Sequence, residues 1–450
     1  MIKITLARPD LLAFTRQRIE VRRSAFNIVK EQQGAGAALA AIASDLTTTA
    51  ANAAARSGRR LKRLGDLAIR SLAPDRPMRD EVLFIGYIEA CLGLGESLRG
   101  QVRSFAETGM PFALYPFKSG VEQRLIGAFM EEHYDLKHRH EINIIEMAAD
   151  QVPNMFRELG RRQMARSYNI LRTYWELPEA PASWASMLRG IHEIWAPNDF
   201  VARAFRGIFR GPIAIVPPCV EISARTHYDR QHFGLRDGIF WFMFSFDYFS
   251  SPHRKNPLGV VQAFQTAFPG GSEKVGLILK STSTASQHPE FKSAIMDAAR
   301  EDPRIATMDR TLTRDEMLSL INRIDCYVSL HRAEGFGLGM AEAMAMGKPV
   351  IGTNFSGSTT FLSEKTGFPV RYGLRAVQPS EYHFSAGQFW AEPDTAEAAE
   401  SMRCVVRDRS ERDRRAAAGK TFVETNFGRE NVGRIMAERL RDVRLSIGVR

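Results

Sequence analysis

The chain has 450 residues, of which 44% are hydrophobic and 25% are charged, a composition that excludes a disordered protein and supports sizeable buried cores. Its length predicts two to three domains. The four scattered cysteines show neither metal-ligand nor disulfide-framework spacing, which argues against a disulfide-stapled secreted fold and indicates a reducing compartment.

No targeting or membrane-spanning segment is predicted. Residues 1–30 alternate charges with short apolar runs, unlike a secretory signal peptide. Residues 35–55 are the strongest candidate for a span, but they include Asp45 and several threonines and lack a leucine-dense centre. We therefore expect a cytoplasmic protein.

The net charge of +10 is concentrated at one end of the chain. Residues 1–79 contain 15 Lys/Arg against 6 Asp/Glu, a net charge of +9. Such a basic arm suits an anionic partner, such as acidic lipid headgroups, another protein or nucleic acid, and the alternative is a solvated helical face. Among the partners, we expect peripheral contact with the anionic inner face of the cell membrane and no nucleic-acid binding.

In chain order, residues 1–79 are predicted to form a helical extension that ends near Pro74 and Pro77. The apolar run VLFIGY at residues 82–87 predicts a parallel strand covered on both faces. A glycine-rich turn, a helix and another strand follow and complete a βαβ unit. The turn is expected at residues 92–96, the helix at 97–108, and the strands of this half at 112–115, 142–146, 168–175, 193–196 and 213–216.

Pro217 and Pro218 separate this half from a second alternation of strands and helices. Strands are expected at residues 239–246, 275–280, 305–309, 326–330 and 349–352, and helices at 257–267, 288–299, 314–321 and 337–346. Two such sets predict an α/β protein with two doubly wound domains, at residues 80–235 and 236–429, that face each other across a cleft. Ligands of such sheets bind at the carboxyl ends of the strands.

The most informative segment is SLHRAEGFGLGMAEAMAMGKPVIGTNFSG, residues 329–357. It predicts a strand end, a glycine-broken turn, a helix and a second strand, with Glu334 before the helix and Glu342 on it. The glycines leave the backbone bare at the helix start, where unsatisfied N–H groups and the macrodipole attract phosphate. Carboxylates beside such a site can accept hydrogen bonds from sugar hydroxyls, so the segment indicates a site for a phosphorylated sugar.

The Glu-x7-Glu spacing in EGFGLGMAE, followed by GKPV at residues 347–350, resembles the signature of the retaining, nucleotide-sugar-dependent glycosyltransferases of bacterial group 1, family 4. The resemblance covers roughly residues 81–430 and implies the GT-B fold of two Rossmann-like domains. It also implies that the final helix, residues 430–450, packs back onto the first domain. A nucleotide-sugar donor would bind the second domain, and a glycan or lipid-linked acceptor of polysaccharide biosynthesis in the cell envelope would bind the first.

The resemblance assigns donor-side roles around the glutamates. Glu334 would face the donor sugar, and Glu342 would accept hydrogen bonds from the ribose hydroxyls. The backbone N–H groups of Phe336, Gly337 and Leu338 would hold the sugar and the phosphates. The alternative for both glutamates is an ion pair with a nearby cation, Lys348 or Arg332.

Cations that could neutralise a diphosphate leaving group follow the first strands of the second domain. Lys255 falls where the family has the lysine of an Arg-x5-Lys pair, and Arg254 stands in for the arginine, unless it faces solvent. Lys280, at the end of the next strand, and Ser358, after the last motif strand, are further donor-binding candidates.

On the acceptor side, the expected turn containing Gly93 and Gly95 could bring backbone N–H groups to the leaving phosphate or the reaction centre. Asp150 and Glu176 follow strands and are our candidates for acceptor-side catalytic contacts, with a purely structural role as the alternative. Their surroundings resemble blocks of a bacterial polysaccharide branch of the family. Many family members carry a histidine after the strand near residues 174–176, and this chain has none there.

We therefore predict a metal-independent, retaining glycosyltransferase without a cofactor other than its nucleotide-sugar co-substrate. No Asp-x-Asp motif ends a strand of the first domain, and the histidine spacing indicates no metal-ligand cluster. A nucleotide-sugar epimerase or a phosphorylase of the same fold remains an alternative, because fold does not fix function. A non-catalytic, basic membrane-docking scaffold is another.

Overall fold

The structure is a computed structural model that describes residues 79–122, 125–137, 139–220, 227–282 and 288–448. The expected N-terminal helical extension lies outside the described residues, except for Arg79. From Met78 onward the chain forms one structural unit, and this unit contains two α/β lobes. Within the described residues, no helix combines the length and the apolar character needed to cross a membrane.

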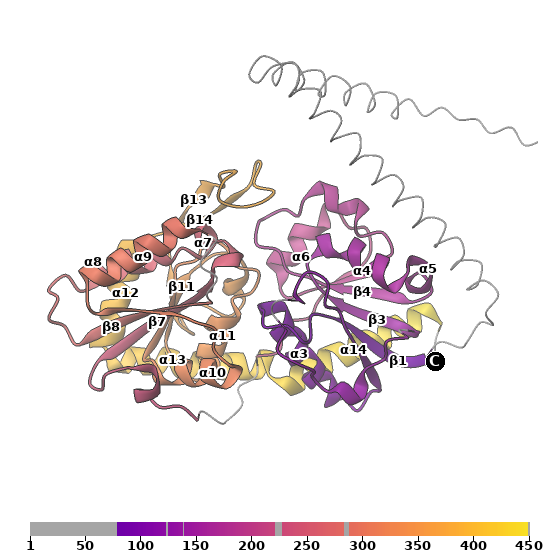
Figure 1. Ribbon diagram of the computed structural model, residues 1–450, viewed down its shortest axis with the longest axis horizontal. Helices are drawn as coiled ribbons and strands as arrows, with labels where there is room; N and C mark the ends of the chain where they lie inside the picture. The colour runs from indigo at the N-terminus through magenta and orange to yellow at the C-terminus, as the bar shows by residue number, and fades with distance from the viewer. Residues whose placement is uncertain (1–78, 123–124, 138, 221–226, 283–287, 449–450) are drawn as a thin grey trace, which may run out of the picture. The chain divides into compact units, whose positions relative to one another are not determined.

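The first lobe is built on a six-stranded, fully parallel sheet in the order β2-β1-β3-β4-β5-β6 (Figure 1). Its strands are β1 (Arg79–Gly86), β2 (Phe112–Pro116), β3 (His140–Glu146), β4 (Tyr168–Arg172), β5 (Glu193–Ala196) and β6 (Ile213–Ile215). Its helices are α3 (Gly93–Ala106), α4 (Val152–Leu159), α5 (Arg161–Met164) and α6 (Asp199–Arg206).

The second lobe has its own six-stranded parallel sheet, in the order β12-β11-β10-β7-β8-β9. Its strands are β7 (Phe240–Asp247), β8 (Val275–Thr282), β9 (Ile305–Asp309), β10 (Cys326–Ser329), β11 (Val350–Thr353) and β12 (Phe368–Val370). Its helices are α7 (Pro252–Lys255), α8 (Pro257–Ala267), α9 (Pro289–Glu301), α10 (Arg314–Arg323), α11 (Leu338–Ala345), α12 (Thr395–Arg407) and α13 (Arg409–Phe427). The prediction of two doubly wound parallel sheets is confirmed.

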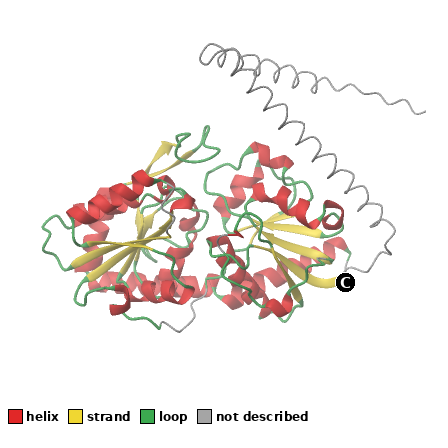
Figure 2. Cartoon of the chain, in the orientation of Figure 1, coloured by secondary structure: helices red, strands yellow, loops and turns green. Residues whose placement is uncertain are grey.

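Helices cover both faces of each sheet (Figure 2). This double cover explains the apolar run at residues 82–86 of strand β1. Val82 and Phe84 face a core formed with α3 and the last helix, α14 (Arg429–Ile447), whereas Leu83 and Ile85 face a core formed with α4 and α6. Because successive side chains of a strand point to opposite faces, burial on both sides requires a continuous apolar run.

Helix α14 packs back on the first lobe. Its apolar residues lie on one face and join the core on the α3 side of the sheet. They are Val432, Met436, Leu440 and Val443. Arg439 adds a two-pronged ion pair with the buried Glu193 of β5, at 2.7 and 2.8 Å.

Two differences from the sequence-based expectation bear on the site. Helix α3 begins at Gly93, so the segment expected as a glycine-rich turn before the helix is the first turn of the helix itself. A Cβ at residue 95 would lie 2.4 Å from the carbonyl oxygen of Ala90, so the backbone approach here requires glycine. In addition, an antiparallel hairpin of β13 (Tyr372–Ala376) and β14 (Phe389–Pro393) stands outside both sheets (Figure 1).

Candidate active site

A cavity of about 630 Å³ lies where the carboxyl ends of strands from both lobes meet. From the first lobe it is lined by the start of α3 and the segments that follow β3 and β4. From the second lobe it is lined by the end of β7, helix α7, and the loop and first turn of α11. Nine of the predicted site residues line this cavity: Gly93, Asp150, Glu176, Arg254, Lys255, Glu334, Phe336, Gly337 and Leu338.

Helix α7 is a single turn whose two ends are fixed by side chains. At its start, the Ser251 hydroxyl accepts a hydrogen bond from the Arg254 N–H and donates one to the carbonyl of Glu381. At its end, the Asn256 amide donates to the Leu330 carbonyl at 2.9 Å and also caps α8, where Pro257 occupies the first helical position. These contacts point the two consecutive cations at positions 254 and 255 into the site.

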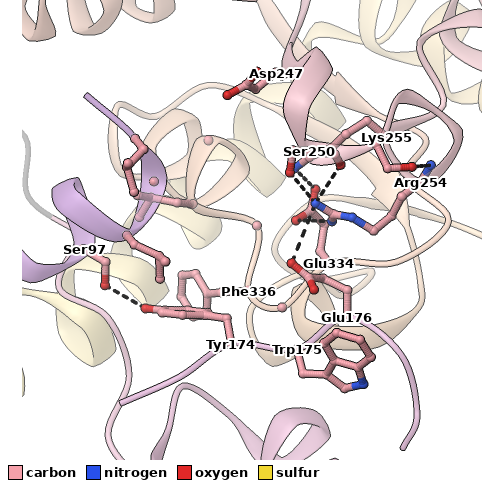
Figure 3. Close-up of a pocket in the computed structure, with 18 of the residues that line it drawn as sticks. Ser97, Tyr174, Trp175, Glu176, Asp247, Ser250, Arg254, Lys255, Glu334 and Phe336 are labelled. Atoms are coloured by element: carbon pink, nitrogen blue, oxygen red, sulfur yellow. Dashed lines mark hydrogen bonds and ion pairs between the residues drawn. The ribbon is translucent and has the colours of Figure 1, made fainter. Parts of the chain in front are cut away.

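Arg254 is 2% exposed, so the alternative that it faces solvent is wrong. Its guanidinium donates to the Ala333 carbonyl at 2.8 Å, to the Ser250 hydroxyl at 2.7 Å and to Glu334 at 3.2 Å (Figure 3). It also lies 3.7 Å from the carboxylate of Glu176. Burial opposes its charge, but Glu176 and Glu334 outweigh that effect and raise the pKa of Arg254.

Glu334 is the centre of this network. Its backbone is held by hydrogen bonds with Ser356 and Gly357 at 2.8 and 2.9 Å, and its carboxylate forms ion pairs with Lys255 and Arg254. Burial favours the neutral acid, but Lys255 and then Arg254 overcome it and lower the pKa of Glu334 to about 2. Burial lowers the pKa of Lys255, an effect that Glu334 opposes. The carboxylate is therefore ionised throughout the physiological pH range.

The loop before α11 brings bare backbone to the cavity. Gly337 has φ +95°, a left-handed conformation that favours glycine, and residues 335–340 all line the cavity. The ring of Phe336 packs against Phe361 and Phe427, which anchors the loop to its own lobe. Since the first N–H groups of a helix have no intrahelical partner, this turn offers donors for an anion.

The first lobe contributes the opposite wall. The Ser97 hydroxyl on α3 lies 2.7 Å from the Tyr174 hydroxyl, and both residues line the cavity (Figure 3). The Asn198 side chain of this lobe donates to the carbonyl of Gly335 at 2.7 Å, which ties the two walls together. Sequence reasoning missed Ser97 and Asn198, because nothing in their local pattern distinguishes them from ordinary helix-start residues.

Four predicted donor-binding residues are absent from the cavity lining: Glu342, Lys280, Ser358 and Gly95. Each has a structural reason. The Lys280 ammonium donates to the Ser281 carbonyl at 2.6 Å, and the fully buried Ser358 hydroxyl bonds to the carbonyls of Thr353 and Phe355. Gly95 is enclosed against the carbonyls of Ala90 and Tyr87.

Glu342 is buried and forms a 2.7 Å ion pair with Arg314 at the start of α10. Arg314 also lies 3.3 Å from Glu96 on α3, so one arginine joins carboxylates of both lobes. Among the described residues, the ion pair of Glu342 is thus with Arg314 and not with the expected Lys348 or Arg332, and Arg332 instead forms a two-pronged ion pair with Glu392. Burial raises the pKa of Glu342 despite the opposing charge of Arg314.

His383 and a cluster that contains two other histidines escaped the sequence prediction. His383, from the loop between β13 and β14, lines the cavity beside Trp175 with ring centroids 5.5 Å apart. His253, His288 and Glu290 have potential metal-ligating atoms within 4.8 Å of one another, although histidine spacing along the chain indicated no such cluster. In each case one partner comes from a distant segment, Trp175 for His383 and His253 for the pair His288 and Glu290, so local spacing in the sequence does not reveal the group.

Comparisons with known proteins agree with this architecture. Residues 272–376 match the family model described as "Glycosyl transferases group 1". No curated protein matches the chain. Solved structures share the fold at low sequence identity. Sucrose-phosphate synthase from Thermosynechococcus elongatus is 13% identical, with a TM-score of 0.62, and the match covers 82% of this chain and 100% of that one.

Two further structures extend the comparison. Anabaena HepE, solved in complex with UDP and glucose, is 13% identical with a TM-score of 0.57, covering 81% of this chain and 100% of that one. The α,α-trehalose 6-phosphate synthase from Burkholderia multivorans is 14% identical with a TM-score of 0.52, covering 68% and 72%. The chain thus has the predicted GT-B fold, and its residues 272–376 match the group 1 glycosyl transferase model. Fold and family match together support a glycosyltransferase, an enzyme of the transferase class.

Proposed function

We propose that the protein is a retaining glycosyltransferase that moves a sugar from a nucleoside-diphosphate sugar to a glycan or lipid-linked acceptor. The observation that carries this proposal is the convergence of Arg254, Lys255 and Glu334 at the bare start of α11. Two adjacent cations and a helix N-terminus suit a diphosphate, while an ionised carboxylate beside them suits the hydroxyls of a sugar. Anabaena HepE, which has a similar fold, was solved in complex with UDP and glucose, and a donor of this class agrees with those ligands.

Lys255 is the group that would exchange partners when the donor binds. Its side chain is 17% exposed, whereas that of Arg254 is 3% exposed and donates to four acceptors, three of which are neutral. A diphosphate entering the cavity can therefore attract the Lys255 ammonium, while Arg254 stays in place and keeps Glu334 oriented. The carboxylate then faces the donor sugar instead of Lys255.

In the proposed reaction the bond between C1 of the sugar and the β-phosphate oxygen breaks, and a bond from C1 to the acceptor oxygen forms on the same face. The acceptor proton passes to a phosphate oxygen of the departing diphosphate. Lys255, Arg254 and the N–H groups at the start of α11 stabilise the negative charge that develops on that diphosphate. The walls contributed by both lobes hold donor and acceptor together and exclude water, which limits hydrolysis of the donor.

The remaining parts of the proposal concern context. We infer a role in polysaccharide biosynthesis of the cell envelope, in the cytoplasm, with the basic residues 1–79 providing peripheral contact with the inner face of the membrane. We also infer that no metal and no cofactor beyond the nucleotide sugar takes part, because the charge of the leaving group can be met by Arg254, Lys255 and backbone N–H groups.

A thermal-shift panel of UDP-, GDP-, ADP- and dTDP-sugars identifies the donor, and NMR of the product made from that donor tests the reaction. The expected result is transfer to an added glycoside with the anomeric configuration of the donor. Inversion at C1 would contradict the retaining mechanism. Epimerised nucleotide sugar without transfer, or cleavage that depends on inorganic phosphate, would replace the proposal with an epimerase or a phosphorylase.

A further inference from the structure

The β13–β14 hairpin belongs in sequence to the second lobe and is anchored there at its base. Arg332 holds Glu392 of β14 with two contacts of 2.9 and 2.8 Å, and Arg375 of β13 pairs with both Glu392 and Glu381. The Ala391 N–H donates to the carbonyl of Arg332 at 2.9 Å. Because a two-stranded hairpin alone is only marginally stable, such anchoring is needed to fix its position.

The tip of the hairpin crosses to the first lobe. The Tyr382 hydroxyl donates to Glu176 at 2.8 Å, and the Gln388 side chain is hydrogen-bonded to both the N–H and the carbonyl of Glu179. Val377 and Trp390 belong to a hydrophobic core of the first lobe. The second lobe therefore supplies part of the wall beside the segment that follows β4.

Aromatic packing fixes the position of His383 in this wall. Its ring lies 5.5 Å from that of Trp175, which in turn packs edge-on against Trp184 at 4.8 Å. Both tryptophans are 2% exposed, whereas the His383 side chain remains exposed to the cavity that it lines. Asp150, exposed and lining the same cavity, comes from the first lobe.

We propose that His383 is a specificity-determining residue that contacts the acceptor, and that the acceptor it admits together with Asp150 and Glu176 is an uncharged sugar rather than a phosphorylated one. This inference rests on the proposed function and extends it to the acceptor.

The chemistry of the lining groups favours a neutral acceptor. Within the described part of the chain, the cavity lining contains four carboxylates, and its two basic residues, Arg254 and Lys255, both contact Glu334. The exposed carboxylate of Asp150 would repel a phosphorylated acceptor. Partial burial lowers the pKa of His383, although the charges of Glu176 and Asp150 oppose this shift, and the lowered pKa favours the neutral imidazole. A neutral imidazole offers one donor and one acceptor, as a sugar hydroxyl requires.

The test uses the full chain saturated with the nucleoside diphosphate that binds it, and follows intrinsic tryptophan fluorescence. Trp175 lies next to His383 and serves as the reporter. The probes are the methyl α- and β-glycosides of glucose, galactose and mannose, with glucose 6-phosphate and mannose 6-phosphate as charged counterparts. The wild type should respond to at least one glycoside and bind the phosphates more weakly.

His383→Ala should weaken glycoside binding about three- to tenfold, the range for one lost neutral hydrogen bond. The exposed Gln378 in the same loop does not line the cavity, so Gln378→Ala is the matched control and should bind glycosides like the wild type. Asp150→Asn should raise the affinity for the sugar phosphates relative to the glycosides severalfold.

Three results would overturn the inference: no response to any glycoside, unchanged glycoside affinity in His383→Ala, or tighter binding of the phosphates by the wild type. Titration of the wild type with the nucleoside diphosphate separates this failure from failure of the proposed function. If the nucleotide binds and no glycoside does, only the assignment of the acceptor falls. If no nucleotide binds, the glycosyltransferase proposal itself falls.

Discussion

Removing the Glu334 carboxylate should destabilise the protein more than removing its lysine partner. In Glu334→Gln, the Lys255 ammonium loses its ion-pair partner, whereas the Arg254 guanidinium keeps the Glu176 carboxylate at 3.7 Å. In Lys255→Met, by contrast, Glu334 keeps Arg254 at 3.2 Å, and the methionine fills most of the lysine's volume. Of the two single variants, therefore, Glu334→Gln is the one that leaves a charge, the Lys255 ammonium, without its ion-pair partner.

Removing one partner of a buried ion pair costs about 3–5 kcal/mol, and the 17% exposure of the Lys255 side chain places Glu334→Gln near 3 kcal/mol. For a lobe of this size, that corresponds to a fall in Tm of roughly 6–12 °C. Lys255→Met should lower the Tm by about half as much. The double variant should fall no further than Glu334→Gln alone, because the two changes together remove the unpaired ammonium.

Differential scanning calorimetry at pH 7 of the wild type, the two single variants and the double variant measures the coupling between Lys255 and Glu334. Ser363→Ala, on the second lobe and away from the cavity lining, serves as a control for ordinary surface-turn substitution. If the fall in Tm of the double variant equals the sum of the two single falls, the predicted coupling is wrong. Additivity would mean that Lys255 and Glu334 do not interact in the folded protein.

Three further predictions concern pH, the second glutamate and the basic arm. The folded-state pKa of Glu334, about 2, lies below the ordinary value of 4.5, so its ionised carboxylate stabilises the fold above pH 4.5. Acidification from pH 4.5 toward pH 2 should lower the free energy of unfolding by on the order of 3 kcal/mol. The Tm should therefore fall less across this pH window in Glu334→Gln than in the wild type. Arg314→Met should lower the Tm more than the double variant Arg314→Met/Glu342→Gln, since only the single change leaves a buried carboxylate unpaired; equal losses would contradict the pairing. Deleting residues 1–78 should preserve nucleotide-sugar binding and reduce sedimentation with phosphatidylglycerol vesicles, and unchanged sedimentation would remove the membrane role.

Much of the fold was readable from local pattern. The bounds of β5, β9 and α8 agree with the prediction, because each segment is apolar in the correct period and flanked by turn residues or, for α8, by Asn256 and Pro257. The start of α3 was misplaced because Gly93 and Gly95 were interpreted as a turn. In the structure, glycine there permits close backbone approach within the helix.

The donor side of the candidate site was predictable to the extent that its chemistry is contiguous in sequence. Arg254, Lys255 and the loop from Glu334 to Leu338 line the cavity together because each follows a strand of one parallel sheet. The pairing of Glu342 with Arg314 was not predictable, because these residues lie on different helices and meet only in space.

The hairpin was not predicted either. Its strands have five residues each, and β13 is largely exposed, so neither shows the long apolar run or regular alternation that marks a core strand. The contacts that hold its tip, such as Tyr382 with Glu176, join residues more than 200 positions apart. Local sequence patterns cannot bring such residues together, and this is why His383 escaped notice.

Isothermal titration calorimetry with UDP, GDP, ADP and dTDP tests most directly whether the cavity holds a nucleoside diphosphate through Lys255 and its neighbours. We expect that at least one of them binds the wild type, that the corresponding nucleoside binds more weakly, and that Lys255→Met weakens the diphosphate about tenfold or more, as expected for a lost charge-assisted hydrogen bond. Absence of binding by all four, or equal affinity for the wild type and Lys255→Met, would show that the cavity does not bind a diphosphate in this way.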